Sequence, residues 1–285
     1  MTKTLTQLSI GITVPTSKEV SFDCPIHGLQ TYTTYQRPDG SWADPYCPEC
    51  KRIVSERESL LEILQADAKQ RAVELARHLH YERPLDFDTP TFENYIPETT
   101  EEEKNLAICR RFAERFTERE LERERAHNAQ DQFWRKKNST GLLLFGNYGT
   151  GKTHLVYSIL KELDRQGLPG FYITIPDLFD RLSDRTNQVD NAAVLAKLCM
   201  VSCLVLDEIG VQSGSEYEKK RLYQIIDGRI KNGRPTILLT NLDHIELGRL
   251  LTERVLTRVT QSTYKLLFTG RCRREPVRCS AEEVF

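Results

Sequence analysis

The sequence predicts an α/β fold in which a parallel-sheet core without a full lid domain follows a small N-terminal module and a helical linker. Three observations lead to this fold class. Short apolar runs alternate with amphipathic segments through the second half of the chain, a glycine-rich motif follows the first of these runs, and four possible metal ligands lie within the first 50 residues. We therefore divide the chain into residues 1–50, 51–137 and 138–285.

The bulk composition is that of a soluble globular protein. The chain has 285 residues, of which 39% are hydrophobic and 28% charged, and its formal net charge is −1. So small a net charge gives no overall attraction to nucleic acid, so any anion must bind at a local patch. No apolar run approaches the roughly 20 residues that span a membrane, and residues 1–11 lack the pattern of a signal peptide. We expect a cytoplasmic protein without a membrane partner, whose eight cysteines stay reduced.

The N-terminal module carries two pairs of metal ligands. Two residues separate Cys24 from His27, and two separate Cys47 from Cys50, with turn-forming residues beside both pairs. Two such knuckles can close a tetrahedral site around Zn²⁺. Because four protein ligands leave no open position, we expect the zinc to be structural. The alternative is a chance cluster of reduced cysteines.

The middle region is strongly charged and mostly helical. Residues 52–80 predict one helix, because their apolar side chains recur at steps of three, four or seven residues. These side chains are Ile53, Leu60, Leu64, Ala68, Ala72, Leu75 and Leu79. Three prolines then interrupt the chain, and residues 101–125 predict a second charged helix.

The last region predicts the strands of a parallel sheet. Its apolar runs are short, and the amphipathic segments between them are long enough for helices, which is typical of strand–helix–strand units with helices on both faces. The predicted strands are residues 142–145, 171–175, 203–206, 236–240 and 265–268.

A phosphate-binding loop follows the first strand. The sequence fits G-x-x-x-x-G-K-[ST] between a strand and a helix, and it consists of Gly146, Asn147, Tyr148, Gly149, Thr150, Gly151, Lys152 and Thr153. Its backbone N–H groups and the helix N-terminus would surround the phosphates of ATP. Lys152 would reach the terminal phosphates, and the Thr153 hydroxyl would bind Mg²⁺. The alternative is a chance glycine-rich turn.

Polar side chains end two later strands. Asp207 closes an apolar run and can hold Mg²⁺ through water, and Glu208 can orient or deprotonate the attacking water. Asn241 follows the next predicted strand and could position the same water, although it could also be a simple strand-end cap. Glu208 indicates ATP hydrolysis beyond mere binding.

The core resembles the DnaC-type helicase loaders of the AAA+ class. The resemblance rests on residues 207–212 (DEIGVQ), 215–219 (SEYEK), 251–259 (LTERVLTRV) and 91–95 (TFENY), and it covers about residues 90–270. Part of it is shared with IstB-type transposition helpers. It implies an ATPase that assembles as a homo-oligomeric spiral and delivers a replicative ring helicase of the DnaB type onto single-stranded DNA when replication starts.

The resemblance also assigns an arginine finger. Arg258 matches the position from which the family's finger acts on the ATP of a neighbouring subunit, where a positive group stabilises the transition state. Arg254 lies one helical turn away and is the competing candidate. The alternative is that both arginines are only surface residues of a solvent-exposed helix. Only residues 259–285 follow Arg258, which are too few for the last strand and a full lid domain.

DNA contacts are implied at Ser215 and Tyr217, and the neighbouring Lys219 and Lys220 suit a single-stranded backbone. The alternative is a solvated helix start with Ser215 as its N-cap. Residues 133–137 (FWRKK) form a second aromatic and basic cluster, which fits DNA contact and packing equally well. The basic tail, residues 271–274, has no assignment.

The zinc module departs from the family pattern, because a cellular loader is expected to begin with a helical helicase-binding domain. Phage-type loaders with a zinc head are more similar. The module and the helix after it are our candidate for client binding, and the alternative is a head that only stabilises the fold. Two other functions stay open: an IstB-like ATPase that regulates a transposase, and an ATP-gated DNA-binding scaffold with little turnover. Glu208 and Arg258 argue against the scaffold, and the zinc head favours the loader.

Overall fold

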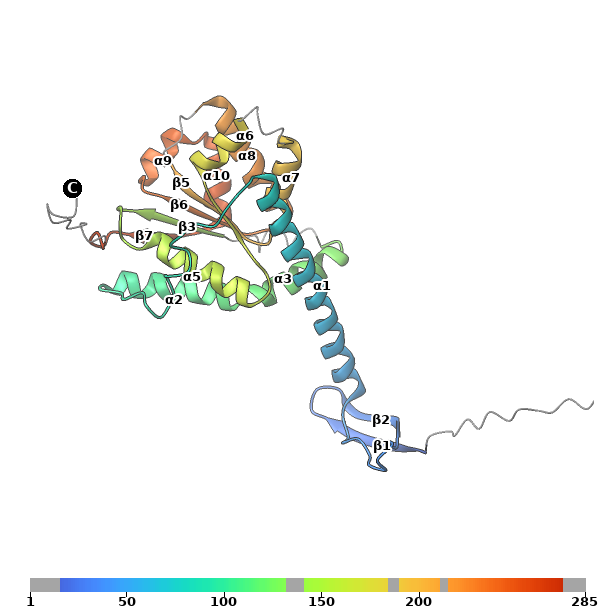
Figure 1. The fold of residues 1–285 in the computed structure, drawn as a ribbon. Coiled ribbons are helices and arrows are strands. Elements are labelled where there is room, and N and C mark those ends of the chain that lie inside the picture. The colour runs from blue at the N-terminus through green and yellow to red at the C-terminus, as the bar shows by residue number, and fades with distance from the viewer. Residues whose placement is uncertain (1–15, 132–140, 184–189, 211–214, 274–285) are drawn as a thin grey trace, which may run out of the picture. The chain divides into compact units, whose positions relative to one another are not determined.

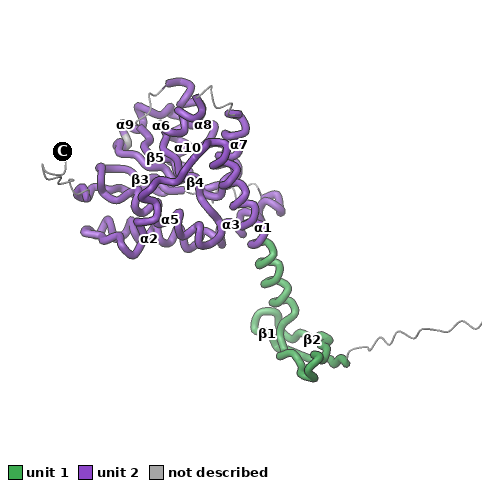
Figure 2. Tube along the Cα trace, in the orientation of Figure 1, with its two compact units in different colours: residues 1–60 green, residues 61–285 purple. Residues whose placement is uncertain are grey.

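The computed structural model describes residues 16–131, 141–183, 190–210 and 215–273. The chain forms two compact units, residues 1–60 and 61–285 (Figure 2). The boundary between them lies inside the long helix α1 (Pro48–His78). Our division at residues 50 and 137 rests on the sequence pattern and stays a prediction.

The first unit consists of a hairpin and the first turns of α1. Strands β1 (Ser17–Cys24) and β2 (Gly28–Tyr35) pair antiparallel with Cys24 opposite Gly28, so the turn between them carries the first pair of metal ligands. The second pair lies at the start of α1. The sequence pattern predicted turns in this region but not the hairpin.

In the second unit, the C-terminal half of α1 buries an apolar stripe. Leu64, Ala68 and Leu75 are buried, as is Leu79 directly after the helix, which confirms the predicted face, whereas Ile53 in the first unit is exposed. The prediction of one continuous helix over residues 101–125 is wrong. This region forms two helices, α2 (Thr100–Glu114) and α3 (Phe116–Asn128), because the backbone of Arg115 departs from helical geometry. Apolar periodicity does not reveal a break of one residue.

Five parallel strands form the sheet of the second unit. They are β3 (Gly141–Gly146), β4 (Phe171–Thr174), β5 (Leu204–Ile209), β6 (Thr236–Thr240) and β7 (Thr263–Phe268). Their order is β4-β5-β6-β3-β7, and every neighbouring pair is parallel. All five correspond to predicted strands, which confirms the expected parallel sheet.

Helices cover both faces of the sheet, because each parallel connection must cross over a face. Figure 1 shows α2 and α5 (Lys152–Arg165) on one face. On the other face lie α6 (Ile175–Ser183), α8 (Glu216–Lys231), α9 (His244–Leu250) and α10 (Glu253–Ser262). Helix α7 (Asn191–Met200) packs against α8.

Because all five strands are parallel, their carboxyl ends lie at one edge of the sheet. Ligands of open α/β sheets bind outside this edge. Buried side chains of β4, β5, β6 and the covering helices form one contiguous cluster. Strand β7 is the last helix or strand among the described residues. No described helix is both long and apolar enough to cross a membrane.

Candidate nucleotide-binding and metal sites

The loop between β3 and α5 has the backbone of a phosphate-binding loop. Gly146 adopts a φ of +121°, and a Cβ there would lie 2.2 Å from the carbonyl oxygen of Phe268, so no side chain fits. Gly151, with a φ of +91°, caps the N-terminus of α5 beneath the ring of Tyr95. The chain therefore wraps around the helix N-terminus, whose free N–H groups can bind an anion.

The first two residues of α5 direct polar atoms into this loop. Lys152 is buried, and its Nζ donates to the carbonyl oxygens of Gly146 (2.8 Å) and Asn147 (2.6 Å). The Thr153 hydroxyl donates to Oδ2 of Asp207 at 3.3 Å. The ammonium and the hydroxyl thus lie where a phosphate and its magnesium ion could be held.

A tyrosine that the motifs did not reveal holds Asp207. Tyr172 on β4 donates its hydroxyl to Asp207 Oδ2 at 2.8 Å, and the backbone N–H of Glu208 donates to Oδ1 at 2.6 Å. Burial and the Asp207 carboxylate raise the pKa of Tyr172, so its phenol stays protonated and remains a donor. No sequence pattern marked Tyr172, because it becomes a neighbour of Asp207 only once β4 pairs with β5, where Tyr172 lies two residues before the register partner of Asp207.

Glu208 is held in an unusual backbone conformation. Its φ is +58°, and it lies where the pairing of β5 with β6 shifts register between Leu206 and Ile209. A non-glycine residue in this region costs free energy, which the surrounding sheet must offset. The conformation leaves the Glu208 side chain exposed at the strand end, beside the buried Asp207.

These groups line one cavity of about 860 Å³ at the carboxyl ends of the strands. Asp207, Glu208 and Asn241 lie there together with most of the loop, namely Tyr148, Gly149, Thr150, Gly151, Lys152 and Thr153. Gly146 and Asn147 instead accept hydrogen bonds from Lys152 through their carbonyl groups. A cavity of this size suits a small-molecule ligand such as a nucleotide.

Residues 271–273 of the unassigned basic tail line the same cavity, and Arg274 lies outside the described residues. The backbone N–H of Arg273 donates to Gly149 O at 2.8 Å, and its guanidinium lies 4.6 Å from the ring centre of Tyr95. Arg271 forms an ion pair with Glu98 at 2.5 Å. Because β7 lies beside β3, the residues after β7 emerge next to the phosphate loop, which the strand order alone could have indicated.

The candidate finger, Arg258, does not line this cavity. It lies on α10, is 42% exposed, and forms an ion pair with Asp227 of α8 at 3.3 Å. The competing Arg254 lies over the ring of Tyr223, 5.7 Å from its centre. The structure therefore separates both arginines from the phosphate loop of their own chain.

The predicted DNA contacts lie at the start of α8. Ser215 is the N-cap of this helix, with a reciprocal hydrogen-bond pair to Glu218, so its hydroxyl has a structural role. Tyr217 is 41% exposed beneath the guanidinium of Arg221, Lys219 pairs with Glu216 at 3.0 Å, and Lys220 is exposed. The cluster at residues 133–137 lies outside the described residues.

The four predicted zinc ligands converge in the first unit. The Nδ1 atom of His27 lies 3.7, 3.5 and 3.3 Å from the sulfur atoms of Cys24, Cys47 and Cys50, and the Cys24 and Cys50 sulfurs are 3.7 Å apart. A tetrahedron with Zn–S near 2.3 Å and Zn–N near 2.0–2.1 Å requires ligand separations of roughly 3.5–3.8 Å. The geometry therefore fits a zinc ion held by three thiolates and one imidazole.

The acidity of the thiols also favours a cation at this site. Backbone N–H groups of Ile26 and His27 lower the pKa of Cys24 to about 6. The neighbouring Cys24 sulfur in turn raises the pKa of Cys50 to about 11. Deprotonation of Cys50 beside the Cys24 thiolate is therefore unfavourable unless a cation compensates the negative charge. A divalent metal ion would supply this compensation.

A phosphate loop on a parallel sheet, with an acidic strand end beside it, defines a nucleotide-binding protein of the P-loop class. The profile of the IstB-like ATP binding proteins matches residues 111–265. The chain belongs to this family.

Individual relatives confirm the resemblance to DnaC-type loaders. The chain is 34% identical to the replicative helicase loader DnaC of Escherichia coli strain K12 over 179 residues, which are 62% of this chain and 65% of the relative. It is 33% identical to the DnaC of Buchnera aphidicola subsp. Schizaphis graminum over 172 residues, 59% of this chain and 62% of that one. The chain thus spans about two thirds or less of the length of these relatives.

Two solved structures share the fold. A crystal structure of DnaI superposes with a TM-score of 0.53 at 23% identity, covering 67% of this chain and 94% of that one. A crystal structure of the DnaC helicase loader gives a TM-score of 0.53 at 22% identity, covering 65% and 100%. At this level of identity the likeness concerns the fold alone.

Proposed function

We propose that this protein is an ATPase that loads a replicative ring helicase of the DnaB type onto single-stranded DNA during the initiation of replication. The observation that carries the proposal is the 34% identity to the DnaC loader over 179 residues of a chain that also forms the nucleotide cavity. We place this activity in the cytoplasm.

The residues that line the cavity support ATP hydrolysis, because each of them can take a separate role in the reaction. Lys152 would leave its two carbonyl partners to bind the terminal phosphates, because a phosphate is a stronger acceptor for an ammonium group than a carbonyl is. Thr153 and Asp207 would hold Mg²⁺, which supplies positive charge to the phosphates. Glu208, in its strained position, would activate the attacking water, and Asn241 would orient it.

The separation of Arg258 from the phosphate loop supports a role in trans. A half-exposed arginine on the surface of α10 can enter the nucleotide cavity of a second copy, where it would stabilise the charge of the transition state. We therefore propose a homo-oligomer in which each ATP site lies between two subunits. Asp227 holds the guanidinium in place until the neighbour binds.

Single-stranded DNA would contact the start of α8. Tyr217 offers a ring for stacking, and Lys219 and Lys220 offer charge for the backbone. Ser215 would contribute through the helix start that it caps. The zinc head, with Zn²⁺ held by its four ligands, and the helix that follows it are the proposed client-binding part of the chain.

One experiment tests the proposed function directly. The purified protein, ATP and a DnaB-type helicase from the same organism are incubated with circular single-stranded DNA, and helicase retained on the DNA is measured. We expect loading that requires ATP and fails with Lys152→Ala. If the helicase is neither bound nor loaded, the proposal is wrong, and the IstB family profile then favours a transposase as the client.

A further inference from the structure

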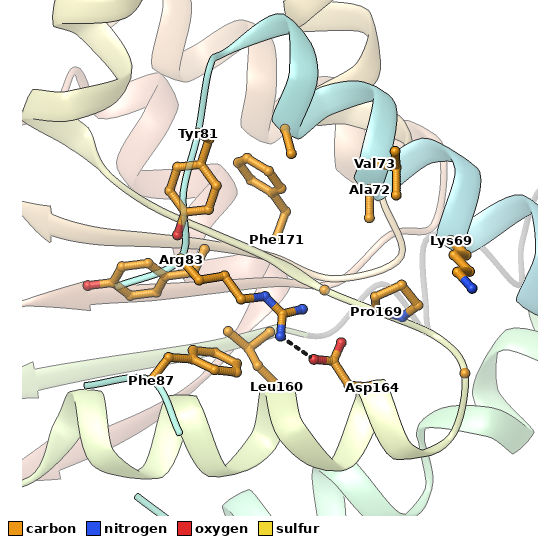
Figure 3. A pocket seen from close by; sticks show the side chains of 14 residues that line it. Lys69, Ala72, Val73, Tyr81, Arg83, Phe87, Leu160, Asp164, Pro169 and Phe171 are labelled. Carbon is orange, nitrogen blue, oxygen red and sulfur yellow. Dashed lines mark ion pairs between the residues drawn. The ribbon is translucent and has the colours of Figure 1, made fainter. Parts of the chain in front are cut away.

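A second cavity lies apart from the nucleotide site in the second unit. Figure 3 shows it between the C-terminal half of α1, the segment that follows α1, helix α5 and the start of β4. Its volume is about 480 Å³, which is within the ~300–1,000 Å³ range of small-molecule sites. The phosphate loop, the acidic end of β5 and the four metal ligands contribute none of its lining residues.

Four aromatic rings line part of the wall. Tyr81 and Phe171 pack with their ring centres 4.8 Å apart, and Phe87 and Tyr172 complete the ring-lined side. On the opposite side, α1 presents the small side chain of Ala72. Rings on one side and a methyl group on the other favour a flat apolar occupant.

The charged groups of the cavity favour an anion. Asp164 is already neutralised by Arg83, whose guanidinium lies 2.7 Å from that carboxylate and over the ring of Phe87. Lys69 lines the same cavity, is exposed, and has no carboxylate partner among the described residues. The lining therefore carries one uncompensated positive charge, and an acidic group on the occupant would complement it.

The wall of this cavity is connected to the nucleotide site. The ring of Tyr172 lines the cavity, and its hydroxyl donates to Asp207, the proposed magnesium ligand, at 2.8 Å. Tyr157, which lines the nucleotide cavity, packs against Tyr172 at 5.1 Å and against Phe87 at 5.2 Å. Three packed rings thus separate the two cavities, and one hydrogen bond links the wall of the first to the carboxylate of the second.

We propose that this cavity is an effector site for a small, flat aromatic anion, and that its occupant strengthens the binding of ATP and Mg²⁺. The aromatic body would lie among the rings, and the acidic group would pair with Lys69. By packing on Tyr172, the occupant would hold that ring where its hydroxyl fixes Asp207. The coupling rests on the proposed nucleotide site, whereas binding of the occupant does not.

Occupancy is tested with two fluorescent probes that share a similar aromatic body. The anion 8-anilinonaphthalene-1-sulfonate carries a sulfonate, and N-phenyl-1-naphthylamine lacks it. We expect saturable binding of about one sulfonate probe per chain, weakened at least tenfold by Ala72→Phe, which fills the cavity. The exposed Ala66 on the same helix provides the control, because Ala66→Phe adds the same ring outside the cavity.

The anion contact is tested by reversing the charge. Lys69→Glu should weaken the sulfonate probe about fivefold and change the neutral probe less than twofold, whereas Lys104→Glu on α2 should change neither. If Ala72→Phe fails to fold, the comparison of Lys69→Glu with Lys104→Glu still tests the site. Equal binding of the sulfonate probe in the wild type and in both cavity variants would overturn the site.

The coupling is tested by calorimetric titration of ATP and Mg²⁺ with and without saturating sulfonate probe. We expect about fivefold tighter nucleotide binding with the probe, a change within the usual range of coupling between two sites. Tyr172→Phe keeps the ring but removes the hydroxyl, so it should bind the probe normally and lose the coupling. Probe binding without any effect on nucleotide affinity would overturn the regulatory role, and a wild type that binds the probe but no nucleotide would instead contradict the proposed function.

Discussion

In the first unit, the side chains that are both buried and apolar are Cys24 and Cys47, two of the four proposed zinc ligands, as far as residues 16–60 are described. The second unit instead buries a contiguous apolar cluster drawn from its sheet and helices. A two-stranded hairpin is only marginally stable by itself, and so short a unit buries too little surface to fold unaided. The difference favours two stabilising principles within one chain: hydrophobic burial in the ATP-binding unit and, as we propose, metal coordination in the head.

The largest expected effect comes from removing the metal. Cys47→Ser combined with Cys50→Ser should abolish zinc binding and unfold the head, because structural zinc contributes ~10–16 kcal/mol to small domains. ATP binding by the second unit should stay within twofold. Elemental analysis and amide hydrogen exchange over residues 16–60 and 61–131 measure the two responses. A wild-type protein, prepared without chelator, that contains almost no zinc would contradict the site.

The next effect concerns chemistry in the second unit and should leave the head unchanged. Glu208→Gln should keep ATP binding and lower turnover by about 10³-fold, because an amide cannot take a proton from water. Lys152→Ala should prevent binding itself. Nucleotide titration and phosphate release separate the two variants. Normal turnover in Glu208→Gln would contradict the assigned role.

A loss of similar size should follow from Arg258→Ala, but this loss can be rescued. Removing a finger arginine lowers turnover by ~10³-fold or more in related phosphoryl-transfer systems. Mixing the inactive Lys152→Ala and Arg258→Ala proteins should restore part of the activity, because one interface then combines both intact residues. Phosphate release is measured against protein concentration. Full activity of Arg258→Ala alone would move the assignment to Arg254.

A smaller effect tests whether the second unit holds the DNA. Tyr217→Ala should weaken binding of a labelled single-stranded oligonucleotide about tenfold, since stacking contributes roughly 1–3 kcal/mol per base. Tyr264→Ala on β7 is the control, because this tyrosine is also exposed but lies on a different element. Fluorescence anisotropy at several salt concentrations measures both. Unchanged affinity in Tyr217→Ala would place the DNA elsewhere.

The smallest effect is a pH dependence of the second unit. Burial lowers the pKa of His154, whose ring contacts Thr91 O at 2.9 Å. The folded state therefore binds this proton more weakly than the unfolded state, so stability is complete above the unfolded pKa of ~6.5 and falls as the pH drops below it. Thermal unfolding between pH 7.5 and 5.5 should show a decrease that is smaller in His154→Gln. Equal slopes in both proteins would contradict it.

The local patterns of the sequence determined much of this structure. Apolar runs located all five strands, because the inner strands of a parallel sheet are buried on both faces and must be almost entirely apolar. The edge strand β7 still buries Leu266 and Phe268. The spacing of Cys24, His27, Cys47 and Cys50 predicted a cluster that the structure brings together, since each knuckle needs only two intervening residues. The loop at residues 146–153 was recognisable because its geometry requires glycine at set positions.

Tertiary structure alone decided which distant side chains meet. Tyr172 reaches Asp207 only because β4 and β5 are neighbours in register, and Arg273 reaches Gly149 only because β7 lies beside β3. The positive φ of Glu208 lies at a register shift that the residue types do not predict. Residues of one motif are a few positions apart in the chain, so the short backbone between them determines how close they lie. The order of the strands depends instead on how the whole unit packs. For this reason the sequence predicted the motifs, and the structure supplied the contacts between them.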